Sequence, residues 1–161
     1  MIYCPNCTSE LISKIIDGEQ RLACSDESCS YILWDNPVPV VAALVELDGN
    51  YIIARNAQWP EGMFSVIAGY LEKGETPEQA VMRECEEELG LSGVVVGYIG
   101  NYSFFEKNQL IIAYEIKASG NINLNHELAE VKLLSRTELQ EYDFATLEIS
   151  EKIISDWLKQ F

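Results

Sequence analysis

Residues 69–91 read GYLEKGETPEQAVMRECEEELGL, and this stretch contains the clearest folding signals of the chain. Thr76 is a favoured helix N-cap, Pro77 suits the first helical position, and Gln79 can complete a capping box with Thr76. Gly90 marks the expected end of the helix, because glycine commonly follows the last helical residue. The stretch therefore predicts a glycine-containing loop that leads into a helix ending at Gly90.

Glutamates crowd the second half of this expected helix. At about 100° per residue, Glu84, Glu87 and Glu88 fall within an arc of roughly 100°, at the edge of the apolar side. A glutamate run is ordinarily a solvated acidic surface, which costs about a few tenths of a kcal/mol per like-charged pair. A solvated surface has no need to adjoin the apolar side, whereas hard cations such as Mg²⁺ require several carboxylate oxygens from one direction. Arg83 precedes Glu87 by one helical turn and can orient it through an ion pair.

The same stretch has the spacing G-x5-E-x7-R-E-U-x-E-E-x-G-U, in which U is a bulky aliphatic residue. This pattern resembles the signature of the Nudix hydrolase superfamily, and its glycines and charged positions all match. Cys85 departs from the signature because it occupies the first U position. Cysteine is small and apolar, so we interpret Cys85 as a core residue and not as a nucleophile.

The resemblance implies an α/β (α+β) Nudix sandwich, in which a mixed sheet lies between helices, and hydrolysis of a nucleoside diphosphate linked to another group. It also implies that a catalytic Mg²⁺ or Mn²⁺ activates water while a glutamate collects the proton. Glu88 is the preferred candidate for this base, and Arg83 is expected to support Glu87 or Glu88. The metal ligands that the resemblance implies are a backbone carbonyl of Ala68 or Gly69 and the side chains of Glu84, Glu87 and Glu88.

Four of the five cysteines lie near the N-terminus, in a segment with little apolar mass. Two residues separate Cys4 from Cys7, and four residues separate Cys24 from Cys29. Two close thiol pairs suit a closed, tetrahedral Zn²⁺ site of the structural type, although a spacing of two residues in both pairs is commoner. We expect a small zinc ribbon here; the alternative is a set of reduced thiols on a short hairpin.

A zinc ribbon followed by this motif resembles the branch of the family that contains NADH pyrophosphatases and zinc-ribbon FAD or ADP-ribose pyrophosphatases. Residues 34–37 (WDNP) also look like that branch. NADH pyrophosphatases carry a Ser-Gln-Pro-Trp-Pro-Phe-Pro block after the motif, whereas residues 101–107 read NYSFFEK, which argues against NADH as the preferred substrate. Aromatic side chains can stack on a substrate base or simply pack, and the candidates are Trp34, Tyr102, Phe104 and Phe105.

An acidic segment, HELAE at residues 126–130, resembles the place where this branch contributes another acidic ligand or base. Glu127 aligns slightly better than Glu130, and both are candidate catalytic residues. Glu127 is also a candidate metal ligand. The alternative is a surface acidic loop without a catalytic role.

The rest of the chain alternates strands with helices. Residues 40–47 and 51–54 flank an Asp-Gly-Asn turn and predict a β-hairpin. An apolar stripe over residues 153–161 predicts an amphipathic C-terminal helix, and Ser135 can begin a shorter one. The further runs that favour strands are residues 64–68, 93–99, 110–116 and 130–134.

The charge and length of the chain limit its partners. Among the 161 residues, 26 Asp and Glu against 11 Lys and Arg give a formal net charge of -15, which disfavours nucleic acid as a partner. A small dinucleotide can still bind if divalent cations neutralise the acidic field locally. The length fits a zinc ribbon over residues 1–36 and a catalytic domain over residues 37–161.

The N-terminal sequence lacks a secretory signal, and no apolar run approaches about 18 residues. We therefore expect a cytoplasmic protein without a membrane segment. Related ribbon-bearing enzymes suggest a homodimer. The main functional hypothesis is hydrolysis of a dinucleotide such as FAD, ADP-ribose or NADH. Removal of NAD caps from RNA is a second hypothesis, and a non-catalytic nucleotide sensor is a third, against which the retained glutamates argue.

Overall fold

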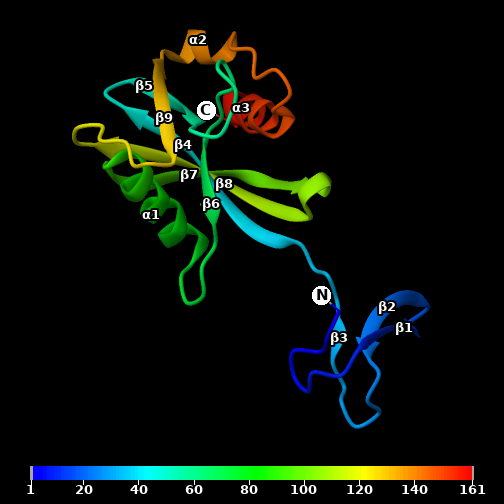
Figure 1. Cartoon of the computed structure of the whole chain (residues 1–161). Coiled ribbons are helices and arrows are strands. Elements are labelled where there is room, and N and C mark those ends of the chain that lie inside the picture. The colour runs from blue at the N-terminus through cyan, green and yellow to red at the C-terminus, as the bar shows by residue number, and fades with distance from the viewer. Residues whose placement is uncertain (1, 161) are drawn as a thin grey trace. The chain divides into compact units, whose positions relative to one another are not determined.

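The computed structural model describes residues 2–160, and the chain divides into two compact units at the junction of Asn36 and Pro37. Each unit has its own sheet (Figure 1), with one buried cluster in the first unit and two in the second. No helix among the described residues is long and apolar enough to cross a membrane.

Three short antiparallel strands form the first unit, in the order β1 (Leu11–Ile16), β2 (Glu19–Cys24) and β3 (Ile32–Leu33). The turn between β1 and β2 is Asp17-Gly18, and both residues have positive φ (52° and 85°). Two successive positive φ values are typical of a type I′ hairpin, which favours an Asp-Gly pair. The buried apolar residues of the first unit are Cys4, Leu11, Ala23 and Cys24. So few residues give this unit little stability from apolar burial alone.

Six strands form one sheet in the second unit, in the order β7-β8-β4-β5-β9, with β6 paired to β4. The pair β4–β8 is parallel and the other pairs are antiparallel, so the mixed sheet expected from the sequence is confirmed. The strands are β4 (Val38–Leu47), β5 (Asn50–Asn56), β6 (Ile67–Tyr70), β7 (Ser92–Phe104), β8 (Gln109–Ser119) and β9 (Leu128–Leu134).

Strand β4 is buried on both faces, which explains its nearly continuous apolar sequence. Successive side chains of a strand point to opposite faces, so β4 contributes alternate residues to two separate clusters. One cluster contains Val40, Ala42 and Leu44, and the other contains Val41, Ala43 and Val45.

Helices cover both faces of this sheet (Figure 1). Helix α1 (Pro77–Leu89) packs in the cluster with Val41, and α2 (Arg136–Gln140) and α3 (Glu148–Gln160) pack in the cluster with Val40. The sheet is therefore the middle layer of an α/β/α sandwich, which confirms the expected fold class.

Helix α1 begins and ends as its sequence predicts. The Thr76 hydroxyl accepts a hydrogen bond from the Gln79 amide (3.3 Å), and the Gln79 side chain accepts one from the Thr76 amide (2.9 Å). Gly90 ends the helix with φ 69°, a left-handed conformation that suits glycine. The N-terminus of α2 has a second capping box, formed by Ser135 and Glu138.

Strand β7 is longer than the sequence analysis expected. It continues to Phe104 because β8 pairs with it as far as Phe104–Gln109, through two register shifts in β7. Such bulges bend a strand and disrupt its ladder locally, and the β7–β8 pairing resumes after each one. Much of residues 101–107, which lie between the expected strands 93–99 and 110–116, is therefore part of the sheet.

The C-terminal helix is anchored by Trp157, which is fully buried. Its ring lies 4.6 Å from the ring of Tyr51 in an edge-on arrangement, and the Arg136 guanidinium lies 4.4 Å from its centroid. Ile153 and Ile154 are buried beside it. These contacts confirm the apolar stripe as core packing up to residue 160, and Phe161 lies outside the described residues.

Trp157→Ala is expected to lower the free energy of unfolding by about 3–5 kcal/mol, because it removes a fully buried indole and leaves a cavity. Urea denaturation followed by far-UV circular dichroism measures the change. Trp34→Ala, in the first unit at a side chain that is 45% exposed, is the control and should have little effect. Equal losses in the two variants would contradict a core role for Trp157.

Candidate functional site

Two glutamates of α1 are buried, with 8% of Glu84 and 7% of Glu88 exposed. They are the only buried charged residues in the part of the chain that the structure describes. Glu87, on the same helix, keeps an exposed side chain. Glutamates are rarely buried without a partner, so the surroundings of each carboxylate indicate what the site can do.

Arg83 uses all five of its N–H donors, the full number that a guanidinium offers. Its partners are Glu75 (2.9 and 3.1 Å), Glu84 (2.7 Å), Glu87 (3.0 Å) and the carbonyl of Tyr70 (3.0 Å). These contacts, the Glu75 pair foremost, raise the pKa of the guanidinium. Arg83 was expected to support Glu87 or Glu88. In the structure it contacts Glu87 and Glu84.

Glu75 is a site residue to which the sequence analysis gave no role. Its carboxylate accepts two bonds from Arg83 and a third from the Glu72 amide (2.7 Å). The Arg83 contact lowers the pKa of Glu75. The motif could have identified Glu75, because Glu75 is the glutamate of its G-x5-E part.

The Glu84 carboxylate lies directly against the backbone of Gly69. A Cβ atom at position 69 would overlap that carboxylate, so only glycine leaves room for it. Burial raises the pKa of Glu84, and the adjacent Arg83 partly opposes that rise. Gly69 therefore contributes space for a carboxylate, in addition to its backbone carbonyl.

Glu88 borders a small cavity of about 120 Å³. No hydrogen bond or ion pair joins its carboxylate to another group within residues 2–160. Burial, followed by the charges of Glu84, Glu127 and Glu87, raises its pKa to about 8. The other residues that line this cavity are Ala54, Asn56, Trp59, Ser65, Val66, Ile67, Ala68 and Leu128.

The loop before β9 brings Glu127 toward these carboxylates. The amides of Asn123 and Asn125 donate to the carbonyls of Leu89 (2.8 Å) and Glu88 (3.2 Å), at the end of α1. The Asn125 side chain also accepts the Glu127 amide (2.9 Å). The Glu127 charge consequently raises the pKa of both Glu84 and Glu88.

Glu130 has a different environment. Its carboxylate forms an ion pair with Arg55, with 3.1 Å between the Glu130 oxygen and the Arg55 Nε. The two residues are also opposite each other in the β5–β9 pairing. Of the two acidic residues considered from the sequence, Glu127 thus lies beside the α1 carboxylates and Glu130 is held by Arg55.

The four aromatic candidates for substrate binding have different environments. Tyr102 is buried in the cluster under α3, where its hydroxyl donates to Asp156 (3.2 Å), and Phe104 packs against the same cluster. Phe105 is 86% exposed, in the short 3-10 helix η1 (Phe105–Lys107). Trp34 belongs to the first unit. Tyr102 and Phe104 therefore serve as packing residues, on the sheet face opposite to α1.

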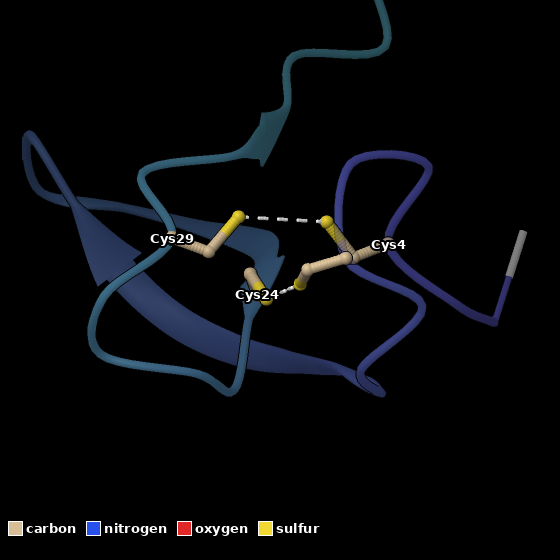
Figure 2. A group of neighbouring side chains, drawn as sticks. Cys4, Cys24 and Cys29 are labelled. Atoms are coloured by element: carbon tan, nitrogen blue, oxygen red, sulfur yellow. Dashed lines mark hydrogen bonds between the residues drawn. The ribbon is translucent and has the colours of Figure 1, made fainter.

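The cysteines of the first unit form a compact cluster. The sulfurs of Cys4, Cys7, Cys24 and Cys29 all lie within 4.8 Å of one another, and Figure 2 shows three of these side chains turned toward a common centre. The Cys7–Cys24 and Cys4–Cys29 sulfur distances are 3.3 and 3.7 Å. Zinc–sulfur bonds of about 2.3 Å in a tetrahedron place sulfurs about 3.8 Å apart, so the cluster has the dimensions of a zinc site.

A local turn explains how the wider cysteine spacing still closes this cluster. The Asp26 carboxylate accepts the amide (2.8 Å) and the hydroxyl (2.7 Å) of Ser28. The Cys29 amide then donates to the Asp26 carbonyl (3.1 Å). The chain therefore turns back within the four intervening residues and returns Cys29 to Cys24.

The α1 carboxylates are less tightly grouped than the cysteines. Within residues 2–160, the cysteine cluster is the one group of three or more potential metal ligands that lie so close together. Arg83 draws Glu84 and Glu87 to its own side, and like charges repel Glu88 from them. The carboxylates of Glu84, Glu87 and Glu88 therefore do not converge as closely as the cysteine sulfurs do.

Residues 36–158 match the model of the NUDIX domain family. This match covers most of the chain, and the chain belongs to the NUDIX domain family. It is similar to a solved NUDIX hydrolase from Nitrosomonas europaea, with a TM-score of 0.84 and 24% identity, over 99% of this chain and 92% of that one. At that identity, the likeness shows a shared fold.

Two sequence relatives are named as hydrolases. The chain is 27% identical over 143 residues to the NAD-capped RNA hydrolase NudC of Vibrio atlanticus, an alignment that covers 88% of this chain and 52% of NudC. It is 38% identical over 107 residues to the NAD-capped RNA hydrolase NUDT12 of Homo sapiens, covering 60% of this chain and 22% of NUDT12. The chain thus spans about half or less of the length of these relatives.

Glu88→Gln is expected to stabilise the fold by about 1–3 kcal/mol at alkaline pH in buffer free of divalent cations, because it removes a buried charge without a partner. The folded pKa of about 8 lies above the ordinary value of 4.5. The folded state therefore binds more protons between these values, and the wild-type protein loses stability as pH rises through them. Denaturant midpoints at a series of pH values measure the gain, which should vanish below pH 4.5.

The exposed neighbour Glu86 provides the matched control, since Glu86→Gln changes the same helix at a solvated position. A gain of stability in Glu88→Gln that did not vary with pH would contradict the assigned burial of an ionisable carboxyl.

Proposed function

We propose that this chain is a divalent-metal-dependent pyrophosphohydrolase that acts on a nucleoside diphosphate derivative. The observation that carries the proposal is the arrangement of acidic groups on α1. Arg83 holds Glu84 and Glu87, while Glu88 borders a cavity together with Ala68. Membership of the NUDIX domain family and the hydrolase names of the relatives support the same class of reaction.

Oxygen donors of this kind suit Mg²⁺ or Mn²⁺. A cation among them would also offset the unfavourable burial of Glu88, whose carboxylate is paired with no other residue in the range 2–160. A bound divalent cation supplies the Lewis acidity that polarises a phosphoryl oxygen and acidifies water. The proposed ligands are the carboxylates of Glu84, Glu87, Glu88 and Glu127 and the backbone carbonyl of Ala68 or Gly69.

Side chains of the protein are proposed to transfer the proton and to orient the carboxylates. Glu88, which borders the cavity and is free of Arg83, is the candidate that accepts the proton of the attacking water. Arg83 holds the carboxylates of Glu84 and Glu87 in place through charged hydrogen bonds. Water adds to one phosphorus and the bond from that phosphorus to the bridging oxygen breaks, so that two monophosphates leave.

Dinucleotides of the FAD, ADP-ribose or NADH type are the proposed substrates. They carry the diphosphate bridge that such a site attacks, and they are small enough to approach a protein of net charge -15 with their cations. A screen of FAD, NADH, NAD, ADP-ribose and diadenosine polyphosphates with product identification tests this. Turnover that yields two monophosphates supports the proposal, and no turnover of any of them counts against it.

Removal of NAD caps from RNA is the second candidate, and the names of the relatives favour it. The acidic net charge opposes long-range attraction of an RNA chain. Parallel assays with free NAD and with NAD-capped RNA separate the two functions. A catalytic efficiency for capped RNA well above that for free NAD would favour the second candidate.

The cysteine cluster is proposed to hold one structural Zn²⁺. The sulfur spacing fits a tetrahedral site, and four thiol ligands leave no coordination position for water or substrate. Because the first unit buries few apolar residues, the metal would supply much of its folding energy.

Glu87→Gln and Glu88→Gln are each expected to lower kcat by two or more orders of magnitude with Mg²⁺, because each removes a charged oxygen donor from the site. Glu86→Gln is the control: it carries the same change on the same helix, and its kcat should stay within about twofold. Steady-state kinetics on the best substrate of the screen measure the effect. Wild-type kcat in Glu87→Gln and Glu88→Gln would reject the assigned site.

Elemental analysis of the purified protein is expected to find one zinc per chain. Cys24→Ser should lower that content sharply, because it removes one of four ligands, whereas the buried Cys85→Ser, in α1, should keep it. A zinc content far below one in the wild type, or equal contents in the two variants, would contradict the proposed ribbon.

A further inference from the structure

Arg55 joins three separate segments of the second unit. It lies in β5 with only 15% of its side chain exposed, and its Nε donates to Glu130 in β9 (3.1 Å). Its Nη1 donates to the carbonyl of Trp59 (3.1 Å). One guanidinium therefore fixes both the neighbouring strand and the following loop.

The Trp59 loop, residues 57–63, has few other attachments to the fold. It leaves the sheet after Asn56, where β5 ends, and Ser65 on the return of the chain forms a bridge with Ala54. Its Ala57 amide donates to the Glu127 carbonyl (2.7 Å), and the amides of Trp59 and Met63 form local turns within residues 56–63. The Asn56 side chain accepts the Gln58 amide (2.9 Å), and the contact from Arg55 is the further side-chain bond that reaches Trp59, in the middle of the loop.

The same loop forms a wall of the cavity beside Glu88. Trp59 lines this cavity together with Asn56, Ala68 and Glu88. A cavity of about 120 Å³ is sensitive to small movements of its walls. The position of the Trp59 loop therefore decides how much room a substrate group finds next to the proposed reaction centre.

We infer that Glu130 and Arg55 are positioning residues, which hold the Trp59 loop so that the cavity can accept the group attached to the diphosphate. This inference rests on the proposed function. Glu130 then affects substrate affinity indirectly, through Arg55 and Trp59, and takes no direct part in catalysis. The acidic residue that lies with the α1 carboxylates is Glu127.

Steady-state kinetics of Glu130→Gln test this assignment. KM should rise about tenfold while kcat stays within about twofold, because the loop shifts but the α1 carboxylates do not. Lys159→Ala, which breaks an ion pair on α3 (2.9 Å to Asp156), is the control and should change neither constant. If Glu130→Gln instead lowered kcat by two or more orders of magnitude and left KM unchanged, Glu130 would be catalytic and the inference would be overturned.

The exchanged pair Arg55→Glu with Glu130→Arg separates positioning from simple stabilisation. It can restore an ion pair between β5 and β9, but a glutamate at position 55 cannot donate to the Trp59 carbonyl. Thermal stability should therefore recover relative to Arg55→Glu alone, while KM stays raised. Recovery of the wild-type KM would overturn the inference.

A measurement without substrate tests the loop directly. In a Trp34→Phe background, acrylamide quenching reports on Trp59, since Trp157 is fully buried. Glu130→Gln in this background should raise the quenching constant about twofold. Unchanged quenching would overturn the inference. This readout needs no turnover, so an inactive wild-type protein would reject the proposed function and leave the loop test intact.

Discussion

The burial of two carboxylates on one helix is the constraint on which the rest of the second unit depends. Glu84 can lie against the sheet only because Gly69 lacks a Cβ atom and because Arg83 supplies a charged donor beside it. Arg83 can do so only because Glu75 holds it with two bonds from the loop before the helix. Loop, helix and β6 are thus connected through one guanidinium, and Glu88 remains as the buried acid without a partner among residues 2–160.

Much of this arrangement is local in sequence, and the local part could be predicted. The cap at Thr76, the stop at Gly90 and the pairing of Arg83 with Glu87 follow from helix geometry within one short stretch. The nearly continuous apolar run of β4 likewise fits a strand that is buried on both faces. These features depend on neighbours that lie a few positions apart, which a sequence displays directly.

The remainder depends on contacts between distant segments. Glu130 resembled a site residue, but its environment is set by β5, through Arg55. Tyr102 was a candidate for substrate stacking, but β7 pairs with β8 as far as Phe104 and Tyr102 is buried under α3. Periodicity and spacing do not reveal which strand will be opposite a residue, so tertiary pairing decided both cases.

Two sets of hydrogen bonds attach the segment between β8 and β9 to the rest of the unit. The amides of Asn123 and Asn125 donate to the last carbonyls of α1, and the Glu127 carbonyl accepts from the chain just after β5. An insertion or deletion there would break one attachment and carry Glu127 away from the helix. The turn at Asp48-Gly49, by contrast, is exposed at the ends of β4 and β5, where a change in length is better tolerated. Over evolutionary time, descendants of this chain that alter the first segment would have to recruit their additional acidic group from another part of the fold.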